Sequence, residues 1–504
     1  MPILFVANDP EAKHGIAPRS ITPTRRRSSR RADFDLGTMP RAKRYPPDSD
    51  EFLAWQCREG LLRALSTWES IAGPLSAWQG RSRSRLRVRV NAGADRNAYY
   101  ARGELGFHSD TNADGRLRRF AASVDVVAHE AGHAFLDAIR PDLFDTPYLE
   151  TNAFHEAFGD CIAILTSLAD AGVRRTLLER DPLLSRANFV ETLMESLANA
   201  TRDVSRDDNA AVPRRGKNRY RWTLPTALPD DGGPGALINE DHSFGQVFVG
   251  CFYDMLRNVF RAARRRNAAA LARAAKVAGT LLVRAAAKAP ITPRFFQAIG
   301  AAMSLEDAAL HGGAHHEAIR LAFRAHGVLL GPVAEVAPRA TLRGGVPKRV
   351  RGRAPVIAKA TIEDLRSRMH IPAQAPMRVR SYELGGRRVA EASHLRPVAL
   401  RGLSRRLANV VALGPEPALI GSARNSAAVL GALPDARTTR DEVRSFVAGL
   451  VRRGAIAFDA SQASRAKRAR SAVRSQGTVT HVVVERRGAK VLKRLRFSCG
   501  CRAR

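Results

Sequence analysis

Three residues in one short stretch carry side chains that could hold a metal ion and act on a water bound to it. His129, Glu130 and His133 form the pattern H-E-x-x-H. Apolar residues recur around them at intervals of three and four, which predicts an amphipathic helix. Histidines four positions apart project from the same face of a helix, so both imidazoles can reach one metal ion. Glu130 would then stand beside the metal, where a general base for the bound water is needed.

A second predicted helix further along the chain supplies a third ligand. Glu156 and Asp160 lie one turn apart in it, again among apolar residues at helical spacing. A catalytic zinc site has three protein ligands and one open position for water or substrate. We expect His129, His133 and Glu156 to be the three ligands. Asp160 is then placed to accept the free N–H of a zinc-binding histidine and to fix its tautomer.

These two segments resemble the metal-binding helices of the thermolysin-like gluzincin metallopeptidases. The resemblance rests on D-V-V-A-H-E-A-G-H and on the downstream F-H-E-A-F-G-D, which is similar to the family's E-x-x-x-D. Glu156 follows His129 by 27 residues, close to the family's interval. The metzincin alternative fails, because Leu136 and Ile139 stand where that family has a glycine and a third histidine. The resemblance covers about residues 90–330 and implies hydrolysis of peptide bonds with one Zn²⁺ ion.

The same resemblance implies further site residues on either side of the two helices. Asn97 and Ala98 match a cleft edge strand that hydrogen-bonds to the substrate backbone, although an ordinary sheet strand would have the same pattern. Tyr148 lies near the position at which the family has a tyrosine that donates to the oxyanion. Its separation from Glu156 is one residue shorter than the family's interval. His242 begins a later predicted helix and is similar to an oxyanion histidine of the wider clan. A structural histidine at a helix start is the alternative interpretation.

The helix and strand patterns around these residues predict an α+β fold with two lobes. A helix over 51–71 and a strand from Leu86 would belong to a small sheet lobe. The H-E-x-x-H helix would cross the cleft. Helical patterns over 267–287, 292–309 and 315–326 predict an all-helical second lobe.

Shifts in composition divide the chain into four predicted parts. Residues 1–49 are expected to be a disordered basic arm, and 50–330 a gluzincin metallopeptidase-like domain. Residues 331–387 have the composition of a basic linker rich in proline and glycine. Residues 388–504 are expected to form a basic C-terminal α/β domain with moderate helical content, one clear helix and a β-hairpin.

The net charge of +34 lies mainly in the last third of the chain. Residues 331–504 hold 36 basic and 11 acidic residues, a net of +25, whereas residues 50–330 have a net charge of +4. This distribution predicts non-specific attraction of residues 331–504 to polyanions. A general bias toward arginine in the composition is an equally good explanation.

Other features of the sequence bear on the cellular location of the protein and on the role of its cysteines. No apolar run approaches the roughly 18–20 residues of a membrane span, and the first residues lack the pattern of a signal peptide. A cytoplasmic protein is therefore expected, with export by a route without a cleaved signal left open. Five cysteines are too few for a disulfide framework. Cys499 and Cys501 could form a redox or metal pair, but an ordinary tail is the favoured interpretation.

Two functions compete with a zinc endopeptidase that acts on a peptide or protein substrate. One is a gluzincin scaffold that no longer cuts and serves as a zinc-stabilised binding module. The presence of Glu130 argues against it, because a structural zinc site has no need of that carboxylate. The other is a polyanion-binding protein that acts through its basic tail. A salt-sensitive affinity for nucleic acid confined to residues 331–504 would identify it.

Overall fold

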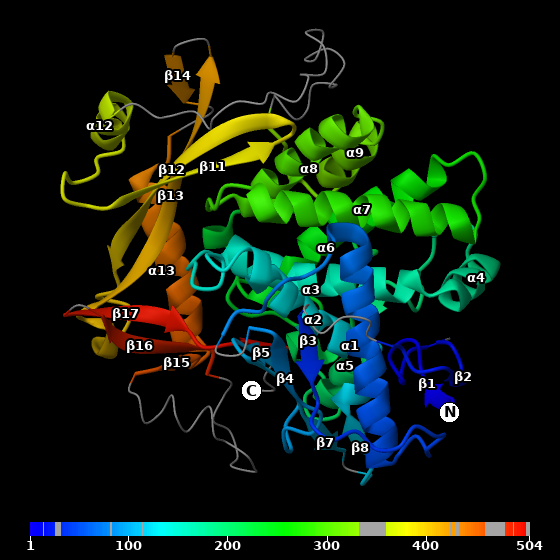
Figure 1. Cartoon of the computed structure of the whole chain (residues 1–504). Coiled ribbons are helices and arrows are strands. Elements are labelled where there is room, and N and C mark those ends of the chain that lie inside the picture. The colour runs from blue at the N-terminus through cyan, green and yellow to red at the C-terminus, as the bar shows by residue number, and fades with distance from the viewer. Residues whose placement is uncertain are drawn as a thin grey trace.

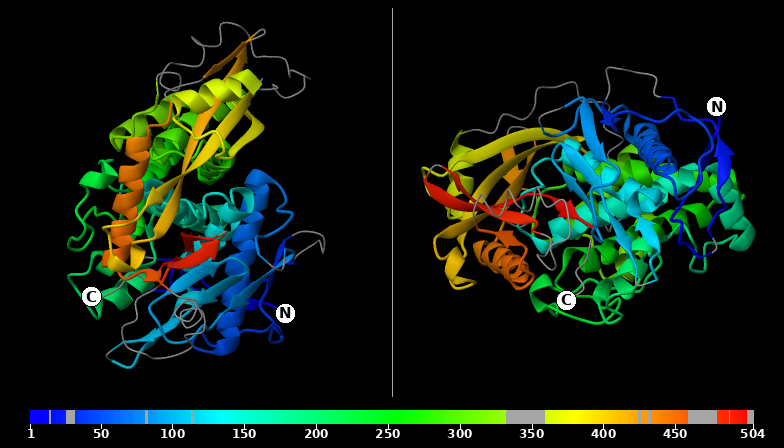
Figure 2. Two further views of the ribbon diagram at one scale, coloured as in Figure 1. Left: turned by 90° about the vertical axis from the view of Figure 1, so that its left-hand side faces the viewer. Right: turned by 90° about the horizontal axis from the view of Figure 1, so that it is seen from below.

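The computed structural model describes residues 1–13, 15–25, 32–80, 83–112, 114–331, 359–423, 426–429, 433–458, 479–486 and 488–499. Within these ranges the protein is a mixed α+β molecule with 11 α-helices and several sheets, which confirms the predicted class. Most helices gather in one body, and a long sheet lies against its side (Figures 1 and 2). Their arrangement as the two lobes of a gluzincin stays a prediction.

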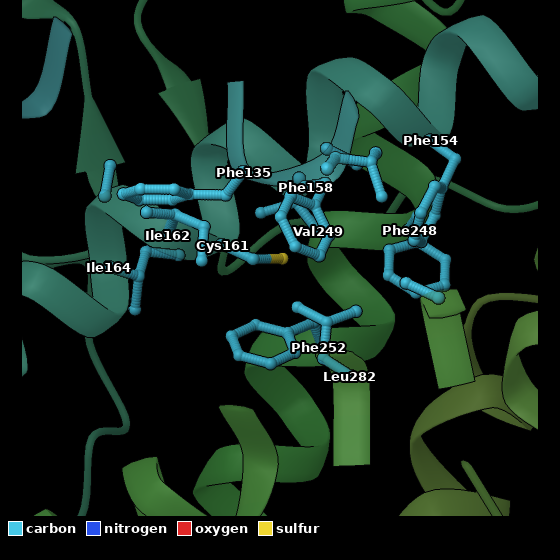
Figure 3. Close-up of a cluster of buried hydrophobic side chains, with 14 of the residues drawn as sticks. Phe135, Phe154, Phe158, Cys161, Ile162, Ile164, Phe248, Val249, Phe252 and Leu282 are labelled. Atoms are coloured by element: carbon cyan, nitrogen blue, oxygen red, sulfur yellow. The ribbon is translucent and has the colours of Figure 1, made fainter. Parts of the chain in front are cut away.

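Two neighbouring helices, α2 (Val124–Ile139) and α3 (Leu149–Ala169), form the centre of the molecule and carry the predicted metal ligands. Ser123 begins α2 by accepting a hydrogen bond from the N–H of Val126. Nearly every residue of both helices is buried, because α1 (Asp50–Ala72) covers α2 and α6 (Asp241–Arg261) covers α3. Figure 3 shows the apolar cluster that results, with aromatic rings from α2, α3 and α6. Burying each large apolar side chain there stabilises the folded state by about 1.5–3 kcal/mol relative to leaving it exposed.

Two glycines allow α2 and α3 to approach each other closely. A Cβ atom on Gly132 would lie 2.8 Å from the Cα atom of Gly159, which is closer than real contacts allow. A Cβ atom on Gly159 would lie 2.6 Å from Nδ1 of His129. The absence of both side chains therefore places the His129 ring directly against α3, where the acidic residues of that helix can reach it.

A five-stranded sheet runs beside these helices in the order β18-β5-β6-β4-β3. Strand β5 (Ala98–Ala101) is antiparallel to β6 (Glu104–Phe107) on one side and to β18 (Phe497–Ser498) on the other. β4 (Arg85–Arg89) contains the strand predicted from Leu86 and is parallel to β6 and to β3 (Asp33–Asp35). The last described segment of the chain thus completes a sheet built from its first hundred residues.

A second sheet is formed by residues from the last third of the chain, in the order β11-β12-β13-β17-β16-β15. The predicted helix is α13 (Ala436–Arg452), and the predicted hairpin joins β16 (His481–Arg486) to β17 (Ala489–Arg494). The helical content expected over 388–459 is wrong, because two long antiparallel strands, β12 (Arg387–Ala399) and β13 (Val410–Ala423), occupy much of this range. Small residues on alternate positions of these strands are buried, a period that belongs to strands; they are Ala390, Ala392, Ala418 and Ile420.

The remaining elements cover the helical body and its surface. Helices α7 and α8 overlap the patterns predicted over 267–287 and 292–309, and each ends one or two residues later; α9 lies within 315–326. The bounds of the other helices are α4 Ala171–Arg180, α5 Glu195–Arg202, α7 Ala268–Lys288, α8 Phe295–His311, α9 His316–Ala325 and α12 Lys359–Arg368. The bounds of the other strands are β1 Ile3–Phe5, β2 Arg19–Ile21, β7 Ser109–Thr111, β8 Leu117–Arg119, β9 Thr192–Leu193, β10 Arg214–Arg215, β11 Met377–Leu384, β14 Ser426–Val429 and β15 Ile456–Ala457.

The first residues of the chain differ from the disordered arm that was predicted for 1–49. Strands β1 and β2 pair with each other, and the side chains of Ile3 and Phe5 are each 1% exposed. Gln56 of α1 accepts a hydrogen bond from the N–H of Val6 and donates one to its carbonyl oxygen. The prediction was wrong because it weighed prolines and charges above a short apolar strand that needs a distant partner. Residues 26–31, which hold most of the arginine cluster, lie outside the described residues.

The last third of the chain packs onto the helical body and shares its core. Val398, Leu400 and Val443 belong to the same apolar cluster as the side chains of α2 and α3. Of the predicted linker 331–387, residues 332–358 lie outside the described residues, and the rest includes α12 and β11. In the described ranges, no helix combines the length and the apolar character that crossing a membrane requires.

Candidate metal centre

The predicted ligands on α2 and α3 meet with their metal-binding atoms close together. Nε2 of His129 lies 3.0 Å from Nε2 of His133 and 3.2 Å from Oε2 of Glu156. Oε1 of Glu156 is 3.6 Å from Nε2 of His133. Bonds of about 2.0–2.1 Å to one tetrahedral zinc would separate such atoms by about 3.3 Å. The buried group of His129, Glu130 and His133 could hold a metal ion, and Glu156 has the position of its third ligand.

Both histidines are held by a second contact on the far side of the ring. Nδ1 of His129 lies 2.8 Å from Oδ1 of Asp160, which is the contact that was predicted. Nδ1 of His133 lies 2.9 Å from Nδ1 of His155, a buried residue of α3 for which the sequence predicted no role. These contacts leave both Nε2 atoms directed at the common centre, as a metal-binding histidine pair requires.

The charges around this centre favour a cation. Burial alone would raise the pKa of the Glu156 carboxyl, but His242 and His129 outweigh burial and hold it below its ordinary value. Burial and Arg214 disfavour a charged His129, yet hydrogen bonds to Asp160 and Glu156 raise its pKa. Protons and guanidinium groups thus neutralise the carboxylates here. A divalent ion would supply that positive charge directly, so the donor set fits a metal such as Zn²⁺.

Glu130 lies next to the ligands without the ion pairs that hold Glu156. Both of its carboxylate oxygens are buried, and the thiol of Cys499 is close enough to donate a hydrogen bond to the carboxylate. Burial raises the pKa of this carboxyl to about 7. A carboxyl group with such a pKa can accept and return a proton near neutral pH, which is what general acid–base chemistry needs.

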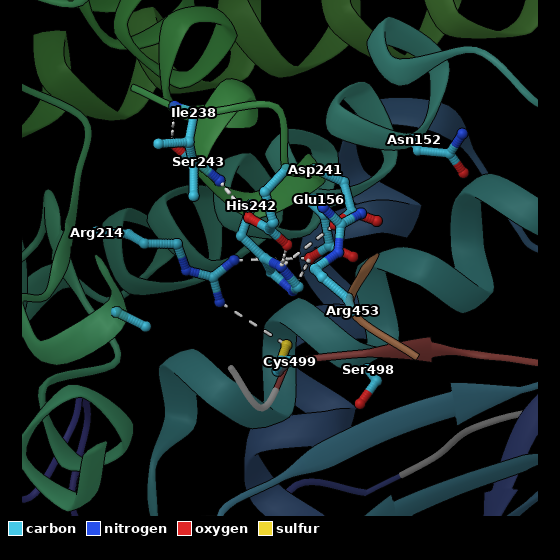
Figure 4. A network of polar contacts seen from close by, with 12 residues as sticks. Asn152, Glu156, Arg214, Ile238, Asp241, His242, Ser243, Arg453, Ser498 and Cys499 are labelled. Atoms are coloured by element: carbon cyan, nitrogen blue, oxygen red, sulfur yellow. Dashed lines mark hydrogen bonds and ion pairs between the residues drawn. The ribbon is translucent and has the colours of Figure 1, made fainter. Parts of the chain in front are cut away.

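His242 enters the centre from the start of α6, where Glu240 is the N-cap residue. Its Nε2 lies 3.2 Å from Oε2 of Glu156 (Figure 4). Its Nδ1 lies 2.6 Å from Oε1 of Glu240. Burial opposes the charged ring, but the carboxylates of Glu156 and Glu240 raise its pKa to about 10. A histidine that keeps its proton at neutral pH can donate to a developing oxyanion.

Arg214 of β10 is a residue of this centre that sequence reasoning missed. Its Nη1 atom lies 3.6 Å from Oε2 of Glu156 and 3.5 Å from Oδ1 of Asp160. The residue comes from the long polar segment over 201–240, and no local spacing distinguishes it from the other arginines there. Its position becomes evident only when α6 and β10 are folded against α3.

Tyr148 differs from the role that the resemblance implied. It is the N-cap residue of α3 and is fully buried. Its hydroxyl donates a hydrogen bond of 2.8 Å to the carbonyl oxygen of Pro415 on β13. The hydroxyl therefore serves the contact between α3 and the second sheet, and the assignment of Tyr148 as an oxyanion donor is wrong for this structure. Its shorter spacing to Glu156 was the one sign of this in the sequence.

Asn97 and Ala98 lie at β5 beside the centre, as expected, but their polar groups already have partners. The N–H of Cys499 donates to the carbonyl oxygen of Ala98 at 2.9 Å. The hydroxyl of Ser498 donates to Oδ1 of Asn97, also at 2.9 Å. The edge that was expected to bind a substrate backbone is thus covered by residues of the same chain.

The segment that covers β5 also brings a thiol to the predicted ligands. Sγ of Cys499 and one ligand atom each from His129, Glu130 and His133 all lie within 4.8 Å of one another. Cys499 is buried, and Arg214 lies 3.8 Å from its sulfur (Figure 4). The sequence favoured an ordinary tail at this residue, and the structure corrects that interpretation.

Comparisons of the chain with protein-family models, with curated proteins and with solved structures found no match. What the centre does is therefore inferred from its geometry and from the motifs that form it.

Proposed function

We propose that this protein is a zinc-dependent endopeptidase of the thermolysin-like gluzincin class. The observation that carries the proposal is the meeting of Nε2 of His129, Nε2 of His133 and the Glu156 carboxylate within 3.0–3.6 Å. Glu130 lies beside them as a buried carboxyl whose pKa burial raises to about 7. A structural metal site needs the first feature but not the second.

The side chains of the centre have separate tasks in this proposal. His129, His133 and Glu156 would hold a Zn²⁺ ion, which would lower the pKa of a bound water to about 7 and polarise the substrate carbonyl. Glu130 removes a proton from the attacking water and then gives it to the leaving amine nitrogen. Protonated His242 donates a hydrogen bond to the oxyanion of the tetrahedral intermediate. The backbone of β5, at Ala98, aligns an extended substrate by strand pairing.

A closed zinc site that only stabilises the fold is the second candidate. The observation that favours it is Cys499, whose sulfur lies close enough to the histidines to act as a fourth ligand. Four protein ligands are typical of structural zinc. Glu130 opposes this candidate, because a structural site derives no benefit from a second buried carboxyl group with a raised pKa.

Glu130→Gln separates the two candidates. The amide keeps the size of the side chain but cannot take a proton, so we expect equal zinc content and cleavage slower by about 10²–10⁴-fold. Zinc is measured by elemental analysis, and cleavage with a diverse peptide pool analysed by mass spectrometry. The peptidase proposal is wrong if neither zinc-loaded wild type nor zinc-loaded Cys499→Pro, which lacks the N–H that donates to Ala98 of β5, cuts any peptide.

A further inference from the structure

The segment Phe497–Cys499 takes the place that the proposed function reserves for a substrate backbone. β18 runs antiparallel to β5, with Ser498 opposite Tyr99. The pairing continues through the N–H of Cys499, which donates to Ala98. An extended peptide that binds to an exposed strand edge makes the same type of contact. The edge of β5 is therefore closed by an internal strand.

A buried aromatic ring anchors this segment on the metal-binding helices. Phe497 is fully buried, and its ring centroid lies 3.8 Å from that of His155 and 4.7 Å from that of His133. The rings are close to parallel, at 23° and 14°. Arg494 covers the ring of Phe497 at 4.0 Å. The segment thus rests directly on one predicted ligand and on the histidine that contacts it.

Cys499, which directly follows β18, places its sulfur beside the predicted ligands. Sγ of Cys499 lies within 4.8 Å of ligand atoms of His129 and His133, and within the same distance of Glu156 and His242. A sulfur and a nitrogen bound to one tetrahedral zinc are about 3.6 Å apart. A movement of at most about 1 Å would therefore bring the sulfur into the coordination sphere, and thiolate is a strong ligand for zinc.

We propose that residues 497–499 are an internal inhibitor of the metal centre. The Cys499 thiol would lose its proton to solvent, and the resulting thiolate would take the fourth coordination position of a bound metal ion, while β18 covers the strand edge that aligns substrate. The inference rests on the proposed function for its metal and its substrate. Water and substrate are excluded by consecutive residues of one strand, so cleavage requires that this strand leaves β5.

Two cavities border the segment Phe497–Cys499. Ser498 lines a cavity of about 550 Å³ together with Asp241 and His242. Cys499 lines a second cavity, of about 50 Å³, together with Arg214 and His242. His242 borders both cavities. Release of Phe497–Cys499 would therefore expose the ligand atoms to a continuous cleft.

The ligand part of the proposal is tested with the full chain loaded with Co²⁺ in place of zinc. We expect wild type to show a near-ultraviolet charge-transfer band from thiolate to cobalt, and Cys499→Ala and Cys499→Ser to bind one Co²⁺ without that band. Cys57→Ala is the matched control, because Cys57 is equally buried but lies on α1, and it should keep the band. A band of equal strength in the Cys499 variants, or none in wild type, overturns the ligand assignment.

Peptide cleavage tests the inhibitory part with the same variants. Cys499→Ala removes the thiol alone, whereas Cys499→Pro also removes the N–H that donates to Ala98. We expect kcat/KM to rise at least about tenfold in the first variant and further in the second, a factor of ten being about 1.4 kcal/mol. Equal kcat/KM in wild type and both variants would overturn the inhibitor.

Failure of the proposed function gives a different pattern. If the band depends on Cys499 but no variant cuts any peptide, the thiolate ligand stands and the peptidase is wrong. If wild type cuts and no band depends on Cys499, the peptidase stands and the inhibitor is wrong. If no form of the protein binds Zn²⁺ or Co²⁺, both are wrong.

Discussion

At the scale of single residues, what distinguishes the two predicted histidine ligands is the group behind each ring. His129 has a carboxylate, Asp160, at 2.8 Å, whereas His133 has the imidazole of His155 at 2.9 Å. The carboxylate raises the pKa of His129, but burial, followed by the positive charge of His129, lowers that of His133. His129 is therefore the more basic ligand, and the affinity for metal should depend on Asp160 in particular.

Replacing Asp160 by asparagine tests that dependence. The amide can still accept a hydrogen bond from His129 but carries no charge, so we expect metal affinity to fall about 10–100-fold. Competition with a chromophoric chelator measures the affinity. Glu130→Gln is the control, because Glu130 is a carboxylate in the same pocket but does not position the ring of a ligand histidine. The metal affinity of this variant should stay within a few-fold of that of wild type. Equal losses in the two variants would contradict a special role for Asp160.

The choice of ligand residues could be predicted from the sequence because helix phase determines which side chains share a face. His129, His133, Glu156 and Asp160 come from two helices whose periodicity is evident, and a helix fixes which residues share a face. Three other residues of the centre could not be found in this way: His155, Arg214 and Cys499. Arg214 lies in the short strand β10 and Cys499 directly follows β18, both far along the chain from the ligand helices. The contact between His155 and His133 forms only when α3 packs against α2.

At the scale of elements, the closeness of α2 and α3 determines whether the ligands can meet. The two glycines at their crossing leave no room for a methyl group, since Gly159 faces the His129 ring and Gly132 faces Gly159 itself. Periodicity predicted both helices but not the distance between them. The same limit applies to the second sheet, where β12 and β13 pair with each other and the alternate burial along them depends on tertiary packing.

Gly159→Ala should therefore damage the metal centre through packing. The new methyl group would lie 2.6 Å from Nδ1 of His129, so the ring must move and its contact with Asp160 must lengthen. We expect a loss of metal affinity of at least about tenfold and a destabilisation of about 1–3 kcal/mol. Isothermal titration with zinc and denaturant unfolding measure the two effects.

Gly449→Ala is the matched control for that experiment. Gly449 is also helical, but a Cβ atom there would meet only the flexible guanidinium of Arg453, at 3.2 Å. Alanine is the better helix former by about 1 kcal/mol, so this variant should be as stable as wild type or more so, with unchanged metal affinity. Unchanged zinc binding in Gly159→Ala would show that the helices can separate without cost.

At the scale of the whole molecule, one buried carboxylate joins the helical body to the second sheet. Glu306 of α8 accepts hydrogen bonds from Arg284 at 2.6 Å, from Lys288 at 2.7 Å and from the N–H of Gly385 at 3.1 Å. Gly385 lies in the turn between β11 and β12. Burial opposes ionisation of Glu306, but the hydrogen bonds from Lys288 and Arg284 outweigh it and hold the pKa below the ordinary value of 4.5.

Glu306→Gln should weaken the molecule in a manner that depends on pH. Because the folded state lowers this pKa, the stabilisation is complete above about pH 4.5 and is lost as the pH falls through the folded value. We expect the variant to be less stable by about 1–3 kcal/mol at pH 7, and the two unfolding free energies to converge under acid conditions. Urea unfolding between pH 3 and pH 7 measures this difference.

Glu317→Gln provides the comparison for that titration. Glu317 is exposed and pairs with Arg320 one turn further along α9. Surface pairs of this kind contribute little, so its substitution should change stability by less than about 0.5 kcal/mol at any of these pH values. A difference between Glu306→Gln and wild type that stays constant from pH 7 to pH 3 would contradict the role given to the charge.

The pairing of β18 with β5 has a consequence for the order in which the protein is made. Ser498 and Asn97, which join these strands, are 401 positions apart, whereas His129 and Asp160 are separated by 31. On the ribosome, α2 and α3 emerge hundreds of residues before Phe497, at about 5–20 residues per second. For roughly the last 15 seconds or more of this synthesis, the ligand cluster can exist with the edge of β5 still open. Metal capture can thus precede the arrival of Cys499, which then closes a site that is already loaded.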